Sequence, residues 1–283
     1  MAALAPSEVL TYNTVRLECR LRKGGTSTGT AFGFAYLQRE QENVPVLVTN
    51  KHVVAGTEAG TFFLHLADDT GGPKRGSKAP VTLDRFESRW IPHPDPAIDL
   101  CIMPIAPIIH EAQAKGISPF FVPLEKSLIP SPAELTRLTA LEDVVMIGYP
   151  IGIWDSHNNM PVIRKGITAT HPANDYEGRK EFMIDLACFP GSSGSPVVLF
   201  NVGSYADRDG GTVIGSRIKL LGILYAGPQF TAEGEIQVVN VPTQQAAVAM
   251  SRIPCNLGIC IKSAQLLDFE PILELLLAQQ KKA

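Results

Sequence analysis

Short strand-like segments separated by turn residues fill most of this 283-residue chain. Their β-branched and apolar residues alternate or form short runs, a pattern typical of strands and not of long helices. The first set comprises Val15–Arg22, Thr30–Leu37, Pro45–Thr49, Phe62–Ala67, Val81–Trp90 and Asp99–Ile105. The second set comprises Asp143–Gly148, Val162–Thr170, Glu181–Ala187, Ser195–Phe200, Ile218–Ala226, Glu235–Val241 and Gly258–Lys262. Because the strands do not alternate with long helices, the pattern disfavours a doubly wound α/β sheet.

A Pro-rich stretch with one or two helical turns separates the two sets of strands. We therefore expect an N-terminal β-domain over residues 1–107, a linker over 108–140 and a C-terminal β-domain over 141–263. A helix over residues 264–283 completes the chain, because Asp268 can cap it and leucines fall on one of its faces. The predicted fold class is all-β, with two packed antiparallel barrels or sandwiches.

Charge and cysteine content narrow the classes of function. Lys and Arg total 25 and Asp and Glu total 28, so the net charge of −3 argues against a nucleic-acid partner. No signal peptide and no apolar run of about 20 residues is visible, so we expect a cytoplasmic protein without a membrane partner. The cysteines lack the spacing of metal ligands, so we expect free buried thiols and no cofactor, with a Cys255–Cys260 disulfide as the open alternative. The five cysteines are Cys19, Cys101, Cys188, Cys255 and Cys260.

The loop Phe189–Pro196, rich in Gly, Ser and Pro, carries the most chemical information. Such a loop can present a hydroxyl, here that of Ser193, and aim backbone N–H groups at the point where an oxyanion forms during acyl transfer. Gly191 suits this task because it adopts backbone conformations that a side chain would resist. Taken alone, the segment has an ordinary Gly/Ser turn as its alternative interpretation.

Two other segments supply a base and a carboxylate. His52 follows a strand within a short turn, and Asp99 opens an otherwise apolar strand. The chain order His, Asp, Ser is the triad order found on double β-barrels, and Ser195 stands where the α/β-hydrolase motif would need a glycine. Among the other histidines, His65 faces one side of a strand, and we expect it to be structural.

These motifs resemble those of the chymotrypsin-like (trypsin-fold) serine peptidases, especially bacterial trypsin-like peptidase domains and the HtrA/DegP protease core. The matching motifs are Thr49–Val54 around His52, Ile98–Ile102 around Asp99, and Gly191–Pro196 around Ser193. Weaker likenesses occur at Gly29–Thr30, Ile147–Pro150, Arg164–Ile167 and Asn256–Ile261. The resemblance implies two six-stranded β-barrels with the active site between them, and a serine endopeptidase that acts on protein or peptide substrates.

The resemblance also implies a role for each residue of the site. Ser193 would attack the peptide carbonyl, His52 would transfer the proton, and Asp99 would hold the His52 tautomer. The N–H groups of Gly191 and Ser193 would form the oxyanion hole.

Residues of the specificity pocket follow from the same resemblance. Ala187 would lie at the base of the pocket, and Tyr225, Ala226 and Gly227 would form one wall. With no carboxylate at Ala187 to receive Arg or Lys, we expect a preference for small or apolar residues before the scissile bond.

One departure from the family bears on activation. Ser192 stands where many relatives have an aspartate that pairs with a freshly cut N-terminus, so that switch is not available here. An oxyanion loop with a flipped Gly191 peptide, reordered by a substrate or partner, is one expectation for how activity is restrained. The C-terminal helix could dock on the second barrel or serve a regulatory partner or oligomer.

Two other functions remain open from the sequence. A catalytically silent peptidase-fold binding or scaffold protein is the first, although the complete His52, Asp99 and Ser193 set argues against it. An esterase or acyltransferase that uses the same triad is the second.

Overall fold

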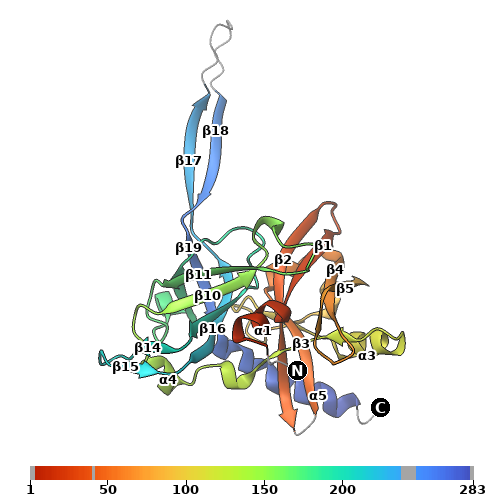
Figure 1. Cartoon of the computed structure of the whole chain (residues 1–283). Coiled ribbons are helices and arrows are strands. Elements are labelled where there is room, and N and C mark those ends of the chain that lie inside the picture. The colour runs from red at the N-terminus through yellow and green to blue at the C-terminus, as the bar shows by residue number, and fades with distance from the viewer. Residues whose placement is uncertain (1–3, 40–41, 237–246, 281–283) are drawn as a thin grey trace, which may run out of the picture.

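The computed structural model describes residues 4–39, 42–236 and 247–280, and it shows two β-sheet halves and a C-terminal helix (Figure 1). The N-terminal half contains α1 (Pro6–Asn13), β1 (Thr14–Leu21), β2 (Thr26–Arg39), β3 (Glu42–Thr49), α2 (Lys51–Val54), β4 (Thr57–Ala67), β5 (Pro73–Asp84), β6 (Ile91–Pro92) and β7 (Cys101–Pro104). The connection contains α3 (Ala106–Ala114), β8 (Pro119–Phe120), β9 (Leu124–Glu125) and α4 (Pro132–Thr136). This arrangement confirms the all-β fold class; the predicted domain boundaries stay predictions.

The strands of the first half belong to one nine-stranded sheet. Its order is β5-β4-β1-β2-β3-β7-β6, with β8 paired to β4 and β9 paired to β2. The expected count of six strands is exceeded because two short strands of the connection join this sheet, and residues 87–89, expected within a strand, form a 3-10 turn. The buried faces of these strands enclose a core that includes Leu17, Phe62 and Phe86.

The second half is a closed six-stranded barrel, as expected, in the order β10-β11-β12-β19-β16-β13. Its strands are β10 (Asp143–Gly148), β11 (Val162–Thr168), β12 (Glu181–Asp185), β13 (Pro196–Asn201), β16 (Arg217–Ala226) and β19 (Leu257–Lys262). Two hairpins interrupt it: β14 (Ser204–Ala206) with β15 (Thr212–Ile214), and β17 (Gln229–Ile236) with β18 (Ala247–Pro254). The strand expected over 235–241 lies largely outside the described residues. A barrel has no free edge, so each of its strands is paired on both sides.

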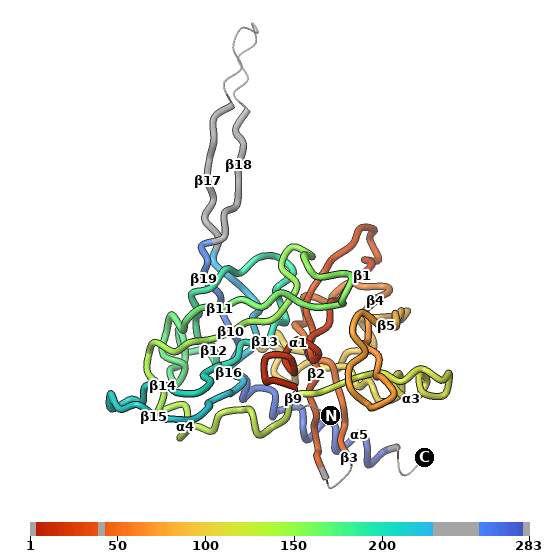
Figure 2. The backbone as a smooth tube through the Cα atoms, in the orientation of Figure 1, coloured from red at the N-terminus to blue at the C-terminus, as the bar shows by residue number. Residues whose placement is uncertain are grey.

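A third core joins the two halves. It combines Phe34 and Tyr36 of β2 with Val198 and Ile223 of the barrel, and all four side chains are buried. The chain then runs through the 3-10 segment Ser263–Phe269 into α5 (Glu270–Gln280), which lies along both halves in the tube view (Figure 2).

The C-terminal segment packs on the barrel, one of the two expectations for it, and also on the N-terminal half. Phe269 is fully buried, and its ring lies 6.4 Å from that of Tyr36 and 5.2 Å from that of His93. The Tyr36 hydroxyl donates to the Leu266 carbonyl at 3.0 Å. Farther along α5, Leu275, Leu276 and Leu277 are exposed, and a partner for them stays a prediction.

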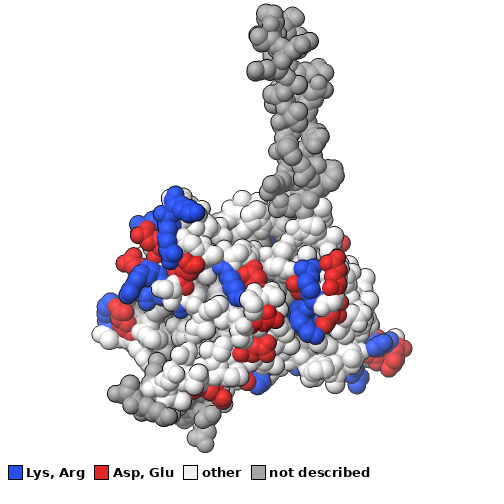
Figure 3. Space-filling model, turned by 180° about the vertical axis from the view of Figure 1, so that it is seen from behind, with Lys and Arg blue, Asp and Glu red and all other residues white. Residues whose placement is uncertain are grey.

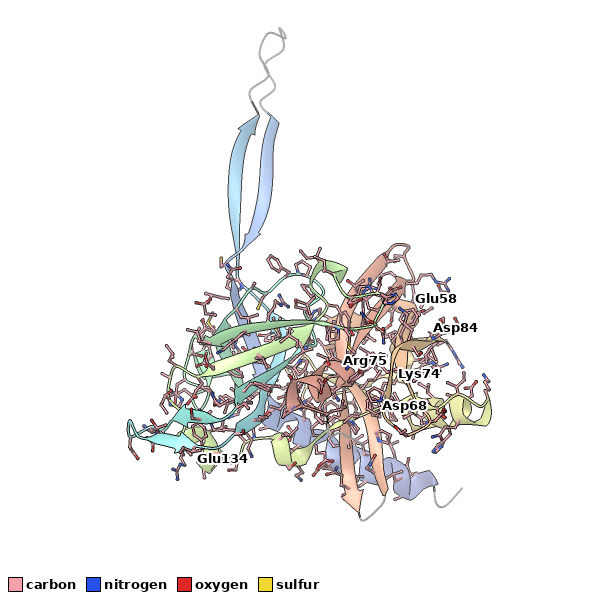
Figure 4. All side chains as sticks on the ribbon, viewed as in Figure 1. Glu58, Asp68, Lys74, Arg75, Asp84 and Glu134 are labelled. Carbon is pink, nitrogen blue, oxygen red and sulfur yellow. The ribbon has the colours of Figure 1, made fainter. Side chains whose placement is uncertain are left out.

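Charged side chains protect the open edge of the first sheet. Strand β5 is a terminal strand of that sheet and carries the exposed Lys74, Arg75 and Asp84, which Figure 4 labels. Charges on an edge strand oppose pairing with another chain. On the face seen in Figure 3, basic and acidic groups alternate instead of forming a patch of one sign.

All five cysteines are free in the structure, so the alternative of a Cys255–Cys260 disulfide is not realised. Cys19, Cys101 and Cys260 are buried, as expected. Cys188 is half-buried and Cys255 is exposed, so the expectation of burial is wrong for Cys255. Cys255 lies between β18 and β19 and not within a strand, which explains its exposure.

His65 is a buried histidine of strand β4. Its ring contacts that of Tyr12 edge-on at 4.8 Å, and the Asn159 amide nitrogen lies 3.2 Å from His65 Nε2. Burial, followed by the nearby Lys78 ammonium, lowers the pKa of His65 to about 4. The imidazole is therefore neutral in the folded protein at pH 7 and serves packing, as the sequence predicts for it.

We predict that His65 makes the protein less stable as the pH falls from about 6.5 to about 4. In this window the unfolded chain binds a proton on His65 and the folded chain does not, so the free energy of unfolding falls by about 3 kcal/mol. Urea unfolding of the wild type and of His65→Phe across this range checks the prediction. The variant should lose this part of the pH dependence, whereas changing the exposed His110 to Asn should retain it. Equal slopes for wild type and His65→Phe would contradict the assignment.

Candidate active site

His52 and Asp99 form a close pair in the N-terminal half. Helix α2 begins directly after β3 and presents His52, whose Nδ1 lies 2.5 Å from Asp99 Oδ2. The His52 backbone N–H donates to the other oxygen, Oδ1, at 3.1 Å. The Asn50 side-chain amide donates to the Asp99 backbone carbonyl at 2.8 Å and thereby holds the Asp99 backbone in place. This arrangement places the Nδ1 proton toward Asp99 and leaves Nε2 as the acceptor.

Ser193 lies in a loop between β12 and β13. The Ser192 N–H donates to the Phe189 carbonyl at 3.0 Å, and this bond closes a four-residue turn whose third residue, Gly191, has a φ of 87°. A positive φ at that position is the geometry of a type II turn, which glycine adopts without strain. A flipped peptide would give a type I turn with negative φ, so the flipped Gly191 expected as a restraint is absent.

The N–H groups of Gly191 and Ser193 have no hydrogen-bond acceptor within the described part of the chain. The carbonyls on either side of Gly191 N–H are both occupied. Pro190 C=O accepts from Ile151 N–H at 2.6 Å, and Gly191 C=O accepts from the Thr30 hydroxyl at 2.9 Å. These bonds turn the carbonyls to other partners and leave both N–H groups available to an anionic oxygen.

Ile151 makes its bond from a strained backbone. Its φ is 52°, in the left-handed region, where a β-branched residue is a genuine outlier. Such strain costs about 1–3 kcal/mol and persists only where the surrounding structure enforces it. The surrounding structure therefore holds Ile151 in this conformation, and the bond from Ile151 N–H to Pro190 C=O fixes the orientation of the Ser193 loop.

Thr30 ties the Ser193 loop to the N-terminal half. Its N–H donates to the Ser193 carbonyl at 2.9 Å, and its own carbonyl accepts from the Thr49 hydroxyl at 2.7 Å. A Cβ on Gly194 would lie 1.9 Å from the Thr30 carbonyl oxygen, so only glycine fits there. Since Thr49 ends β3 shortly before His52, this contact brings the Ser193 loop beside the His52 helix.

Tyr225 of β16 contacts Ser193 through its backbone carbonyl. The Ser193 hydroxyl donates to the Tyr225 carbonyl at 3.5 Å, and the Tyr225 hydroxyl donates to Glu181 at 2.8 Å. Burial raises the pKa of Tyr225 to about 12, with further contributions from Glu181 and from the charge of Asp99. No hydrogen bond joins His52 to Ser193 among the described residues. Catalytic hydrogen bonds are often long in unliganded structures and shorten when substrate binds.

A cavity of about 340 Å³ opens beside Ser193. Its lining carries no charged side chain among the described residues and consists of Cys188, Phe189, Pro190, Ser193, Leu224, Tyr225, Ala226, Gly227 and Pro228. The three wall residues expected from the sequence, Tyr225, Ala226 and Gly227, line this cavity. Ala187, expected at the base of the pocket, is half-buried and is not among the lining residues, and its carbonyl accepts from the guanidinium of Arg164.

Sequence reasoning missed three residues that shape this site: Thr30, Ile151 and Arg164. Thr30 and Arg164 lie within short segments that match the family pattern, yet their side-chain partners are more than 20 positions away in the sequence. Nothing in the local sequence around Ile151 indicates its positive φ, since glycine or asparagine would be the usual residue there.

Neither a metal site nor a membrane-spanning helix is found in the described ranges. No group of three or more His, Cys, Asp or Glu residues there could hold a metal ion. None of the helices in the same ranges is both long and apolar enough to cross a bilayer.

A family model for the trypsin-like peptidase domain matches residues 29–203. This range includes His52, Asp99 and Ser193. No curated protein matches the chain.

Several solved structures resemble this one. The HtrA-type protease AlgW, solved with a tripeptide, has a TM-score of 0.47 and 17% identity, with 92% of this chain and 60% of that chain covered. The chain thus spans 60% of the length of AlgW. The Rv3671c protease from M. tuberculosis, in its active form, has a TM-score of 0.43 and 14% identity, with 94% and 86% covered. Deg5 has a TM-score of 0.44 and 15% identity, with 79% and 87% covered.

We predict that Thr30→Val destabilises the protein by about 1–3 kcal/mol, because it keeps the shape but removes the hydroxyl. That hydroxyl donates to Gly191 C=O and accepts from Tyr149 N–H at 3.2 Å, and both groups would be left buried and unpaired. Urea unfolding measures the loss. Thr30→Ser keeps the hydroxyl and should retain most of the stability. Equal stabilities of the Val and Ser variants would contradict the role of this bond.

Proposed function

The chain belongs to the trypsin-like peptidase domain family, and on that premise we propose that it is a serine endopeptidase with His52, Asp99 and Ser193 as its catalytic triad. The observation that carries the proposal is the paired contact of His52 with both oxygens of Asp99. A peptidase acts on protein or peptide substrates, so the partner of this site is an extended peptide.

The reaction begins when a peptide carbonyl lies next to Ser193. His52 Nε2 takes the hydroxyl proton as Ser193 Oγ attacks the carbonyl carbon, and Asp99 stabilises the resulting imidazolium through Nδ1. For this step Ser193 Oγ turns from the Tyr225 carbonyl toward His52, a rotation about a single side-chain bond. His52 then delivers the proton to the leaving amine, and water hydrolyses the acyl-enzyme by the same route.

The negative oxygen of the tetrahedral intermediate needs hydrogen-bond donors. The N–H groups of Gly191 and Ser193 are suited to this role, because only Ser192 separates them in the loop and they have no other acceptor in the described chain. Loss of one such donor typically costs a factor of about 10² to 10³ in rate. The type II turn supports an oxyanion hole that is formed before substrate arrives.

Substrate preference follows from the cavity beside Ser193. Its lining offers aromatic, apolar and thiol groups, with Cys188 and Phe189 where the sequence predicted Ala187. Burial raises the pKa of Cys188 to about 11, so its thiol is neutral at pH 7. A side chain that enters this cavity meets no charge partner, which supports small or apolar residues before the scissile bond.

The alternative functions fit these observations less well. A silent scaffold protein would not need free N–H groups in the loop or a close His52–Asp99 pair. An esterase would use the same groups, and its substrates are the comparison in the experiment below. A cytoplasmic location and a regulatory partner at the C-terminal helix stay predictions.

We predict that Ser193→Ala abolishes hydrolysis and that Asp99→Asn lowers kcat by about 10⁴-fold, because Asn favours the wrong His52 tautomer. Covalent labelling by a fluorophosphonate probe and hydrolysis of a quenched peptide library measure both effects. Ester and peptide substrates with the same acyl group distinguish the esterase. A Ser193→Ala protein that cleaves peptides as fast as wild type would refute the triad.

The same library should show cleavage after small or apolar residues, because charged side chains would enter the cavity without a partner. Mass spectrometry of the products identifies the residue before each scissile bond. Gly227→Ala, which would place a Cβ 2.7 Å from the Leu257 carbonyl and 3.8 Å from Cys188, should narrow the preference toward the smallest residues. A dominant preference for Arg or Lys would contradict the proposed pocket.

A further inference from the structure

Arg164 of strand β11 lies behind the loop that carries Ser193. Its Nη1 donates to the Ala187 carbonyl, and its Nη2 donates to Ser192 Oγ at 2.7 Å. Ala187 precedes the type II turn at Phe189–Ser192, and Ser192 is the last residue of that turn. One planar guanidinium therefore spans the base of the loop, as its rigid fork of donors allows.

Ser192 controls the direction of the neighbouring N–H groups. It is fully buried; its N–H donates to Phe189 C=O at 3.0 Å, and its C=O accepts from Ser195 N–H at 3.0 Å. The Ser192 carbonyl and the Ser193 N–H belong to one planar peptide unit. Fixing the Ser192 side chain thus restricts the direction in which Ser193 N–H points.

The charge of Arg164 is not neutralised by a carboxylate in the described chain. Its Nε is buried and has no hydrogen-bond partner there, and burial lowers the pKa of the guanidinium. Arg217 is a useful contrast, since this partly buried arginine pairs with Glu142 at 2.5 Å. A guanidinium stays charged under all ordinary conditions, so a positive charge without a carboxylate partner in the described chain lies behind the Ser193 loop.

We propose that Arg164 is a positioning residue for the oxyanion hole. It holds Ser192 from behind, so that the N–H groups of Gly191 and Ser193 stay directed together, and its charge favours the negative oxygen that forms in front of the loop. The role rests on the serine endopeptidase function proposed above.

Three variants test the proposal. Arg164→Met keeps the apolar stem and removes the donors, Arg164→Lys keeps the charge, and Ser192→Ala removes only the acceptor. We expect Arg164→Met to lower kcat and the rate of fluorophosphonate labelling by about 10- to 100-fold with little change in KM, because misplaced donors weaken the transition state more than substrate binding. Arg164→Lys should recover part of the loss. The double variant Arg164→Met with Ser192→Ala should lose less than the product of the two single effects.

Arg217→Met is the matched control, since it also removes a partly buried arginine but lies away from the Ser193 loop. Arg217→Met should lower the free energy of unfolding and leave kcat unchanged when it is expressed per fluorophosphonate-labelled active site. If Arg164→Met behaves like Arg217→Met, with unchanged kcat per folded molecule, Arg164 is merely structural and the proposal is overturned.

Amide hydrogen exchange separates this proposal from the proposed function. Exchange over residues 187–195 should be at least about 10-fold faster in Arg164→Met than in wild type, whereas Arg217→Met should not change it. This measurement does not need turnover. Absence of Ser193-dependent hydrolysis in wild type would refute the proposed endopeptidase function. Unchanged amide exchange in Arg164→Met would refute the positioning role of Arg164.

Discussion

The hydrogen bonds of Thr30 connect the parts of this protein that must act together. A single threonine donates from its N–H to the Ser193 carbonyl and from its hydroxyl to the Gly191 carbonyl, while its own carbonyl accepts from Thr49. The first two bonds cross from the first sheet to the loop of the barrel, and the Thr30 and Thr49 side chains are fully buried. Loss of these bonds would leave polar groups without partners in a dry environment, and a side chain at Gly194 would collide with the Thr30 carbonyl.

Around these hydrogen bonds, hydrophobic packing holds the two halves in a fixed position relative to each other. The core that joins them draws Tyr36 from β2, Ile223 from the barrel and Phe269 from the C-terminal segment. Since interiors are packed as densely as organic crystals, small displacements of one half against the other meet resistance. The distance between the His52–Asp99 pair and the Ser193 loop is therefore a property of the whole fold and not of any one loop.

The sequence predicted the all-β class and the barrel, and it pointed to candidate residues of the site whose roles stay predictions, because those signals are local. Alternating strands, a histidine after a strand, and a loop of Gly and Ser can each be recognised within ten residues. It did not predict that β8 and β9 would join the first sheet, nor that the C-terminal segment would contact Tyr36 and His93, because both depend on contacts between distant segments.

The residues that hold the Ser193 loop in place could not be predicted from the sequence for the same reason. Arg164 and Ile151 act through hydrogen bonds to residues far along the chain, and neither residue type indicates this role. The flipped Gly191 was an inference from the need for restraint, and the φ of that residue shows the opposite turn type. Composition and spacing describe which groups are present, whereas orientation of a single peptide is decided by its neighbours in space.

The closure of the barrel by β19 has a consequence for the order of events during synthesis. Strand β19 pairs with both β12 and β16, and the Gly194 N–H bonds to Leu224 of β16. A ribosome must therefore extend the growing chain past residue 262 before the barrel can close around the Ser193 loop. Such long-range pairings form late in folding. Chains that end before β19 consequently lack the closed barrel that holds the Ser193 loop in place.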